Sequence, residues 1–126
     1  MKRHEAREKA LQVLFQLDNT DVTIEEAMEH IKGQPTNVFY EKIVTGTAEH
    51  LEEIDATLEK HLEKWSLARL PKIERTVLRL AVYELLYMPE TPKRVVLNEA
   101  IELCKTFGDE GSSKFVNGVL SKFTEQ

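Results

Sequence analysis

The chain has 126 residues, a single cysteine and a formal net charge of −5 at pH 7. This length suits one domain, one cysteine cannot form an internal disulfide and fits a reducing cytoplasm, and no apolar run approaches the roughly 18 residues of a membrane span. The charge is uneven, with +2 over residues 1–10, −9 over 11–63 and +2 over 64–126, which argues against general affinity for nucleic acid but leaves room for local basic surfaces.

Two helices are predicted in the first part of the chain. Residues 3–18 carry one apolar stripe with the period of an α-helix, formed by Ala6, Ala10, Val13, Leu14 and Leu17. After a break, Thr23 followed by Glu26 is a capping box, which predicts a short helix over 24–32.

A long helix is predicted over 37–62, after a break at 33–36. Asn37 or Thr36 can cap its start. Gly46 lies inside it, and because glycine is unfavourable in a helix interior, this position predicts a kink or a division into two pieces.

A connection over 65–71 separates this first group of helices from a second group. Pro71 suits the start of the next helix, because proline is well tolerated in a first helical turn. That helix, over 73–87, is apolar around most of its circumference, which predicts a central position with partners on several sides.

Two further helices complete the chain. Residues 95–107 are cleanly amphipathic, and Gly108 is typical of the residue that follows a helix. The last helix begins at Ser112 or Ser113 and ends near Thr124. Because no segment shows the alternation of a strand, the sequence predicts an all-α fold of six or seven helices.

No residue pattern predicts a catalytic or metal site. The four histidines lack the spacing of metal ligands, the five glycines form neither a dinucleotide nor a phosphate loop, and no serine has the context of a nucleophile. Cys104 lies on an apolar stripe and is most simply a core residue. We therefore predict no enzyme and no bound metal or cofactor.

Arg3 and Arg7 stand out at the start of the first helix. They lie one turn apart at the edge of the apolar stripe, where basic residues oppose the helix dipole. Either they form a functional basic site, or they are surface residues that pair with Glu5 and Glu8.

Three residues depart from the apolar pattern of their helices. Phe15 points away from the stripe of the first helix, so it packs on a second layer or anchors a protein partner. Glu84 falls among apolar positions, which predicts a buried ion pair with an arginine. Glu74 lies in a first helical turn, where a carboxylate is favourable and can be exposed to a partner.

The segment GSSKFVNGVLSKF, residues 111–123, holds an Asn-Gly pair typical of hairpins, yet its apolar residues follow a helical period. Lys114 and Phe115 offer a cation and an aromatic ring at a helix start, which suits single-stranded nucleic acid. The alternative places Phe115 in the core. Gly118 predicts the close approach of another helix.

Four segments, AREKALQVLFQLD, ERTVLRLAVYELL, VVLNEAIELCKTFG and KFVNGVLSKF, resemble in this order the NusB family of bacterial transcription antitermination proteins. The resemblance implies one domain of two packed helical bundles, over about 1–63 and 72–126, without enzymatic activity. It implies two partners: NusE, a small-subunit ribosomal protein, and boxA, a short single-stranded RNA element of ribosomal RNA leaders. With them the family helps to hold RNA polymerase in a termination-resistant complex.

The resemblance also implies two sets of site residues. Those that match the family's RNA surface are Arg3, Arg7, Lys114 and Phe115. Those that match its NusE surface are Phe15 and Glu74. We expect helix packing at Gly118 to bring the two parts of the RNA surface together. The basic run KRHEARE is diluted by His4 and Glu5, which implies RNA binding that depends more on NusE.

Two other functions compete with this interpretation. The chain could be a helical adaptor that binds only protein, which a steep salt dependence of RNA affinity would exclude. It could also be an RNA-binding module like those fused to RNA methyltransferases. That alternative requires a cofactor-binding domain, which these 126 residues do not contain.

Overall fold

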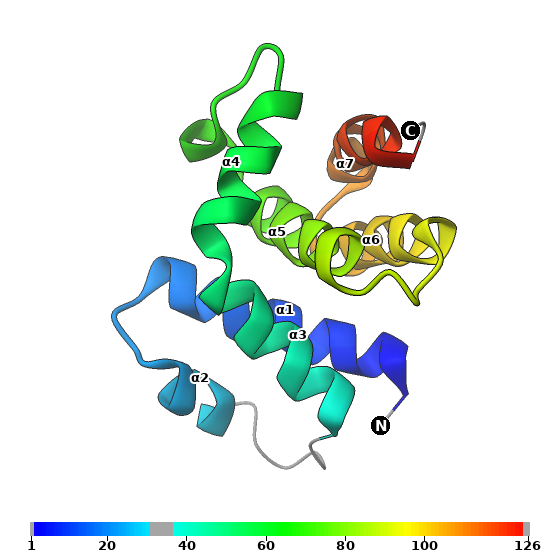
Figure 1. Ribbon diagram of the computed structural model, residues 1–126. Coiled ribbons are helices and arrows are strands. Elements are labelled where there is room, and N and C mark those ends of the chain that lie inside the picture. The colour runs from blue at the N-terminus through cyan, green and yellow to red at the C-terminus, as the bar shows by residue number, and fades with distance from the viewer. Residues whose placement is uncertain (1, 31–36, 125–126) are drawn as a thin grey trace.

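The computed structural model describes residues 2–30 and 37–124, which form helices and no strand (Figure 1). The elements are α1 (Arg3–Asn19), α2 (Ile24–His30), α3 (Val38–Glu49), α4 (Leu51–His61), the 3-10 turn η1 (Leu67–Arg69), α5 (Lys72–Tyr87), α6 (Lys93–Phe107) and α7 (Glu110–Thr124). The predicted all-α class is confirmed.

Side-chain caps fix several helix starts. The backbone N–H of Glu26 donates to Thr23 Oγ1 at 3.1 Å and that of Thr23 donates to Glu26 Oε1 at 3.2 Å, which confirms the capping box of α2. Asn37 caps α3, because its Oδ1 accepts from the backbone N–H of Tyr40 at 2.7 Å. Thr36, the break at 33–36 and the predicted end of the short helix at residue 32 lie outside the described residues.

The last helix begins earlier than predicted, at Glu110. The Asp109 carboxylate accepts a hydrogen bond from the backbone N–H of Ser112 at 2.8 Å, so this aspartate caps the helix and moves its start ahead of the predicted Ser112 or Ser113. Gly108 does follow α6, but its φ of −121° is open to any residue.

The long predicted helix divides into α3 and α4 at His50 rather than at Gly46. Gly46 instead permits close packing, since a Cβ atom there would overlap the ring of Tyr83 on α5. At Gly118 a Cβ atom would have no neighbour within 4 Å. The prediction that Gly118 admits a second helix is therefore wrong, and that role belongs to Gly46.

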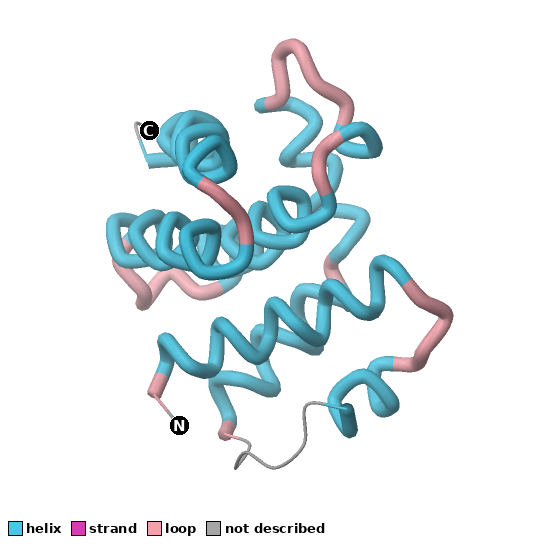
Figure 2. The backbone as a smooth tube through the Cα atoms, turned by 180° about the vertical axis from the view of Figure 1, so that it is seen from behind, coloured by secondary structure: helices cyan, strands magenta, loops and turns pink. Residues whose placement is uncertain are grey.

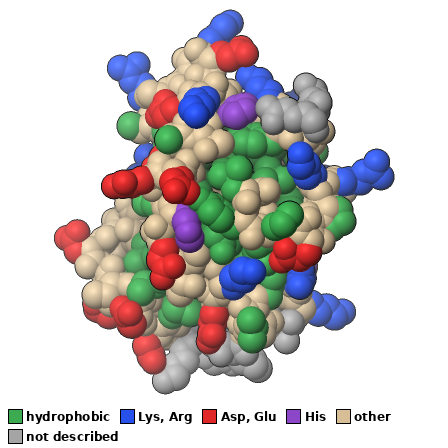
Figure 3. Space-filling view, viewed as in Figure 1, with side chains coloured by type: hydrophobic (Ala, Val, Ile, Leu, Met, Phe, Trp, Pro, Cys, Tyr) green, Lys and Arg blue, Asp and Glu red, His purple; other side chains and the backbone are tan. Residues whose placement is uncertain are grey.

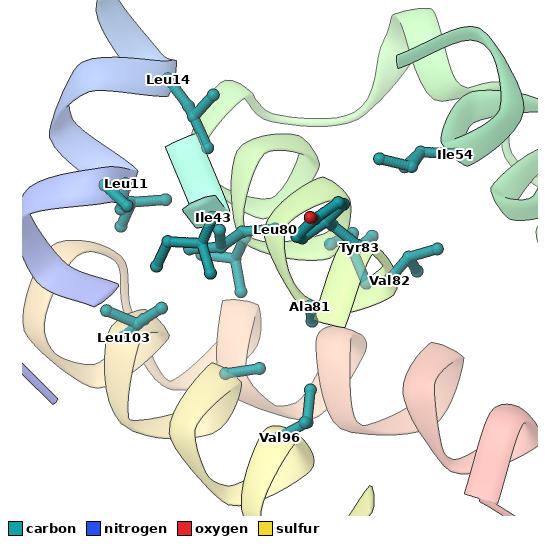
Figure 4. Packing of buried hydrophobic residues seen from close by; sticks show 14 of the residues in the cluster. Leu11, Leu14, Ile43, Ile54, Leu80, Ala81, Val82, Tyr83, Val96 and Leu103 are labelled. Carbon is teal, nitrogen blue, oxygen red and sulfur yellow. The ribbon is translucent and has the colours of Figure 1, made fainter. Parts of the chain in front are cut away.

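Helix α5 lies at the centre, as predicted, and packs against α1, α3, α4, α6 and α7. Figure 4 shows its side chains among those of four neighbouring helices: Leu11, Leu14, Ile43, Ile54, Val96 and Leu103. The boundary between bundles over 1–63 and 72–126 stays a prediction, because α5 packs against helices of both groups.

Helix α6 lies between the first half of α1 and α7 in both views of the backbone (Figures 1 and 2). The start of α1 and the helix that carries Lys114 and Phe115 are therefore not adjacent. The expectation that packing places these two residues beside the start of the first helix is wrong, because α6 packs directly on α7.

Candidate RNA and partner interface

Arg7 is buried in an ion pair with Glu84. Its Nε donates to Glu84 Oε2 at 2.8 Å and its Nη2 to Oε1 at 2.7 Å, while the two side chains are only 3 % and 2 % exposed. The predicted pairing of Glu84 with an arginine is confirmed. The alternative in which Arg7 is a surface residue paired with Glu5 or Glu8 is wrong, because α5 buries it and supplies Glu84 as its partner.

Arg3, in contrast, is exposed at the start of α1. Its guanidinium carbon lies 4.4 Å from the centre of the Phe39 ring, and that of Arg7 lies 5.0 Å from the same centre. Next to it, His4 Nδ1 lies 2.8 Å from Glu99 Oε2 on α6. This hydrogen bond to Glu99 raises the pKa of His4, with nearby carboxylates adding to it.

Lys114 and Phe115 lie near the start of α7. The Lys114 side chain is 79 % exposed and its Nζ lies 4.0 Å from Glu110 Oε1. The Phe115 ring is half-buried and packs against the core, while its contact with nucleic acid stays a prediction. It meets the ring of Trp65 edge-on, with ring centres 5.9 Å apart.

Phe15 and Glu74 are both half-buried. Phe15 lies near the end of α1 and Glu74 near the start of α5, and an ion pair joins these two helix ends. Arg75, the neighbour of Glu74, donates to Asp18 Oδ2 at 2.6 Å, and Asp18 lies one turn after Phe15 on α1. Glu74 Oε2 accepts a hydrogen bond from Ser112 Oγ at 3.3 Å. Burial raises the pKa of Glu74, so this carboxylate is less open than predicted.

The site residues thus form two separate groups. Arg3 and Arg7 lie where α1 begins, beside Glu84 and Phe39. Lys114 and Phe115 lie on α7 within one turn after Ser112, the hydrogen-bond partner of Glu74. The start of α7 therefore adjoins the predicted NusE surface, and α6 separates α7 from the start of α1 (Figure 2).

Trp65 was not among the predicted site residues, because it lies in the predicted connection over 65–71. The side chain is 54 % exposed and faces α7 across a surface groove with Lys64 on the same segment. The sequence signal that could have identified this residue is that the chain's only tryptophan directly follows a lysine, Lys64. Figure 3 shows Lys and Arg side chains mostly at the top and right of the molecule and acidic ones toward the left and lower part.

Within the described part of the chain, no group of three or more His, Cys, Asp or Glu side chains could hold a metal ion. Among the same residues, no helix has the length and apolar character needed to cross a membrane. Burial raises the pKa of the Cys104 thiol to about 12, with Glu74 and Asp109 adding to the effect.

Comparison with known proteins identifies the family. The model of the NusB family matches residues 4–125. Transcription antitermination protein NusB of Lysinibacillus sphaericus (strain C3-41) is 95 % identical over 126 residues, which cover 100 % of this chain and 99 % of the relative.

Two solved structures share the fold over nearly the whole chain. T. maritima NusB has a TM-score of 0.89 at 36 % identity, covering 100 % of this chain and 92 % of its own. A crystal structure of antitermination factors NusB and NusE in complex with double-stranded RNA matches with a TM-score of 0.86 at 35 % identity, covering 99 % and 98 %. The chain therefore belongs to the NusB family of transcription antitermination factors.

Proposed function

We propose that this chain binds boxA-type single-stranded RNA of ribosomal RNA leaders together with NusE, and so helps to hold RNA polymerase in a termination-resistant state in the bacterial cytoplasm. Two exposed cations, each next to an aromatic ring, carry the proposal: Arg3 lies over the buried Phe39 ring, and Lys114 precedes the half-buried Phe115. The family and the relative seen with NusE and RNA support the choice of partners.

On the RNA side, each exposed residue has a distinct role. Arg3 and Lys114 neutralise phosphates, and Phe115 offers the open side of its ring to a base. Arg7 acts indirectly, because its guanidinium is bound to Glu84. It holds the start of α1 and contacts the same Phe39 ring as Arg3.

On the protein side, Phe15 and Glu74 bind NusE. Ribosomal proteins are generally basic, so a carboxylate and an aromatic anchor on two helices joined by the Arg75–Asp18 ion pair suit such a partner. NusE at this end of the molecule would lie close to Lys114 and Phe115, since Glu74 contacts the first turn of α7. The two proteins would then form one continuous RNA surface, which explains why a chain of net charge −5 needs a basic partner.

The test is binding of labelled boxA RNA and a scrambled control RNA, with and without NusE, at two salt concentrations. We expect NusE to increase affinity and boxA to be preferred. Arg3→Ala should weaken binding and flatten the slope of log K against log salt by about 0.7, the loss of one phosphate contact. Lys60→Ala, which removes an exposed cation on α4, is the matched control.

Two results would contradict the proposal. Absence of RNA binding in all conditions would favour an adaptor that binds only protein. Equal affinity for boxA and scrambled RNA with NusE present would contradict the assignment of boxA as the RNA that this chain recognises.

A further inference from the structure

A groove separates the segment that follows α4 from the outer face of α7. Its walls carry Trp65 and Lys64 on one side, with Lys114, Phe115 and Lys122 on the other, and Gly118 lies between them. The groove has a volume of about 260 Å³. This is less than the ~300–1,000 Å³ of sites that enclose a whole small molecule, and it suits one flat group.

Two aromatic rings of the groove are held in place yet remain open. The Trp65 side chain is 54 % exposed, and its ring meets Phe115 at an angle of 77°. Phe115 packs on the core from its other side, which fixes the position of the pair. Fixed, open rings are the platforms on which bases of single-stranded nucleic acid stack.

Gly118 leaves the groove empty at its middle. Glycine is unfavourable inside a helix, and at this position no other helix requires it, because a Cβ atom would have no neighbour within 4 Å. The missing side chain therefore opens space between the Trp65 segment and α7 for something outside the protein.

The charge of the groove selects an anion. Three lysines line it against one glutamate, in a chain of net charge −5. Lys122 is bound to that glutamate, Glu63, at 3.2 Å. Lys64 and Lys114 are exposed beside the rings, where they can meet phosphate groups.

We infer that this groove binds one nucleotide of single-stranded RNA, with its base against Trp65 and Phe115 over Gly118 and its phosphates near Lys64 and Lys114. The inference rests on the proposed function and extends its RNA surface from Phe115 to the segment after α4. An acidic peptide would also bind the lysines, but its carboxylates would not stack on the two aromatic rings beside Gly118.

The test uses Trp65 as a reporter, because it is the only tryptophan of the chain. Single-stranded boxA RNA is titrated into the full chain, alone and with NusE, while tryptophan emission and the anisotropy of labelled RNA are recorded. Trp65→Phe supplies the background emission. We expect quenching of Trp65 emission that saturates together with the anisotropy.

Gly118→Leu fills the groove without removing any contact. It should weaken RNA binding about 5- to 150-fold, the range for loss of one stacked base, with a smaller loss for Gly118→Ala. Its melting temperature should not fall, because leucine is the better helix former. Ala56→Leu, at an exposed position on α4, is the matched control.

Lys64→Glu, with Lys42→Glu as its control, tests the groove without altering α7. If RNA binds but Trp65 emission, Gly118→Leu affinity and Lys64→Glu affinity are all unchanged, the groove inference is overturned while the proposed function stands. If Gly118→Leu weakens only NusE binding, the groove belongs to a protein. If the wild type binds no RNA with or without NusE, both are overturned.

Discussion

Arg7 of α1 and Glu84 of α5 form a two-point ion pair that is almost completely removed from solvent. Each charged group is stabilised chiefly by the other, since burial takes both away from water. Arg7 also contacts Phe39 of α3, so one side chain joins three helices near the exposed Arg3. The start of α1 is therefore held by a residue that is almost completely buried.

We predict that Arg7→Ala lowers the free energy of unfolding by about 3–5 kcal/mol, because it leaves the Glu84 carboxylate buried without its partner. The double variant Arg7→Met with Glu84→Leu should recover most of this loss. Urea unfolding measures both, and Arg3→Ala, expected within about 0.5 kcal/mol of wild type, is the control for an exposed arginine. Wild-type stability of Arg7→Ala together with lost RNA affinity would show instead that Arg7 contacts RNA.

Gly46→Ala should be strongly destabilising, because the added methyl group overlaps the ring of Tyr83, which is itself buried. Overpacking of this kind costs about 1–3 kcal/mol. Gly118→Ala is the matched control and should raise stability by up to about 1 kcal/mol, since its new methyl group meets only open space. Thermal unfolding of the two variants side by side measures the difference, and equal melting temperatures would contradict the close packing of α3 on α5.

Periodicity predicted much of the fold because each helix buries one continuous face. It located α1, α5 and α6 to within two residues and gave α5 its central place. Capping chemistry was equally local, so Thr23 and Glu26 could be paired from sequence alone. The start of α7 was missed because Asp109 and Ser112 are both good caps and only the folded backbone selects between them.

The candidate site was harder to predict, because it depends on which helix covers which edge. The angle of Arg7 on α1 places it beside the apolar stripe, but only the position of α5 decides that it is buried. The position of Glu84 required a cationic partner. That partner, Arg7, lies 77 positions away in the sequence, so the local pattern could not identify it. Gly46 and Gly118 are both glycines inside helices, and their opposite surroundings come from tertiary packing.

His4 should titrate above the ordinary histidine pKa, because its hydrogen bond to Glu99 favours the protonated ring. A pKa raised by folding means that the pair stabilises the folded state below the unfolded pKa near 6.5 and that this contribution is lost as pH rises through the folded pKa. NMR titration of the four histidines measures the shift. In Glu99→Gln the pKa of His4 should fall, and an unchanged value would assign the shift to another cause.

The pair Phe15 and Glu74 predicts a protein surface distinct from the RNA residues at the start of α1. We expect Phe15→Ala and Glu74→Gln each to weaken NusE binding by about 1–3 kcal/mol, the range of an interface hot spot. Glu74→Gln keeps an acceptor for the Ser112 hydroxyl and removes only the charge. Calorimetric titration of NusE into each variant measures the loss, with Glu52→Gln on α4 as an exposed control.

Three further features of the NusE titrations separate this surface from a general effect on charge or folding. The double variant should lose less than the sum of the single losses, because two residues of one interface are coupled. Since burial raises the pKa of Glu74, wild-type affinity for the basic partner should increase as pH rises through that pKa and the carboxylate ionises. This pH dependence should disappear in Glu74→Gln. RNA binding by the isolated chain should barely change in Phe15→Ala or Glu74→Gln. If both variants bind NusE with wild-type affinity, or lose only RNA binding, the NusE surface lies elsewhere.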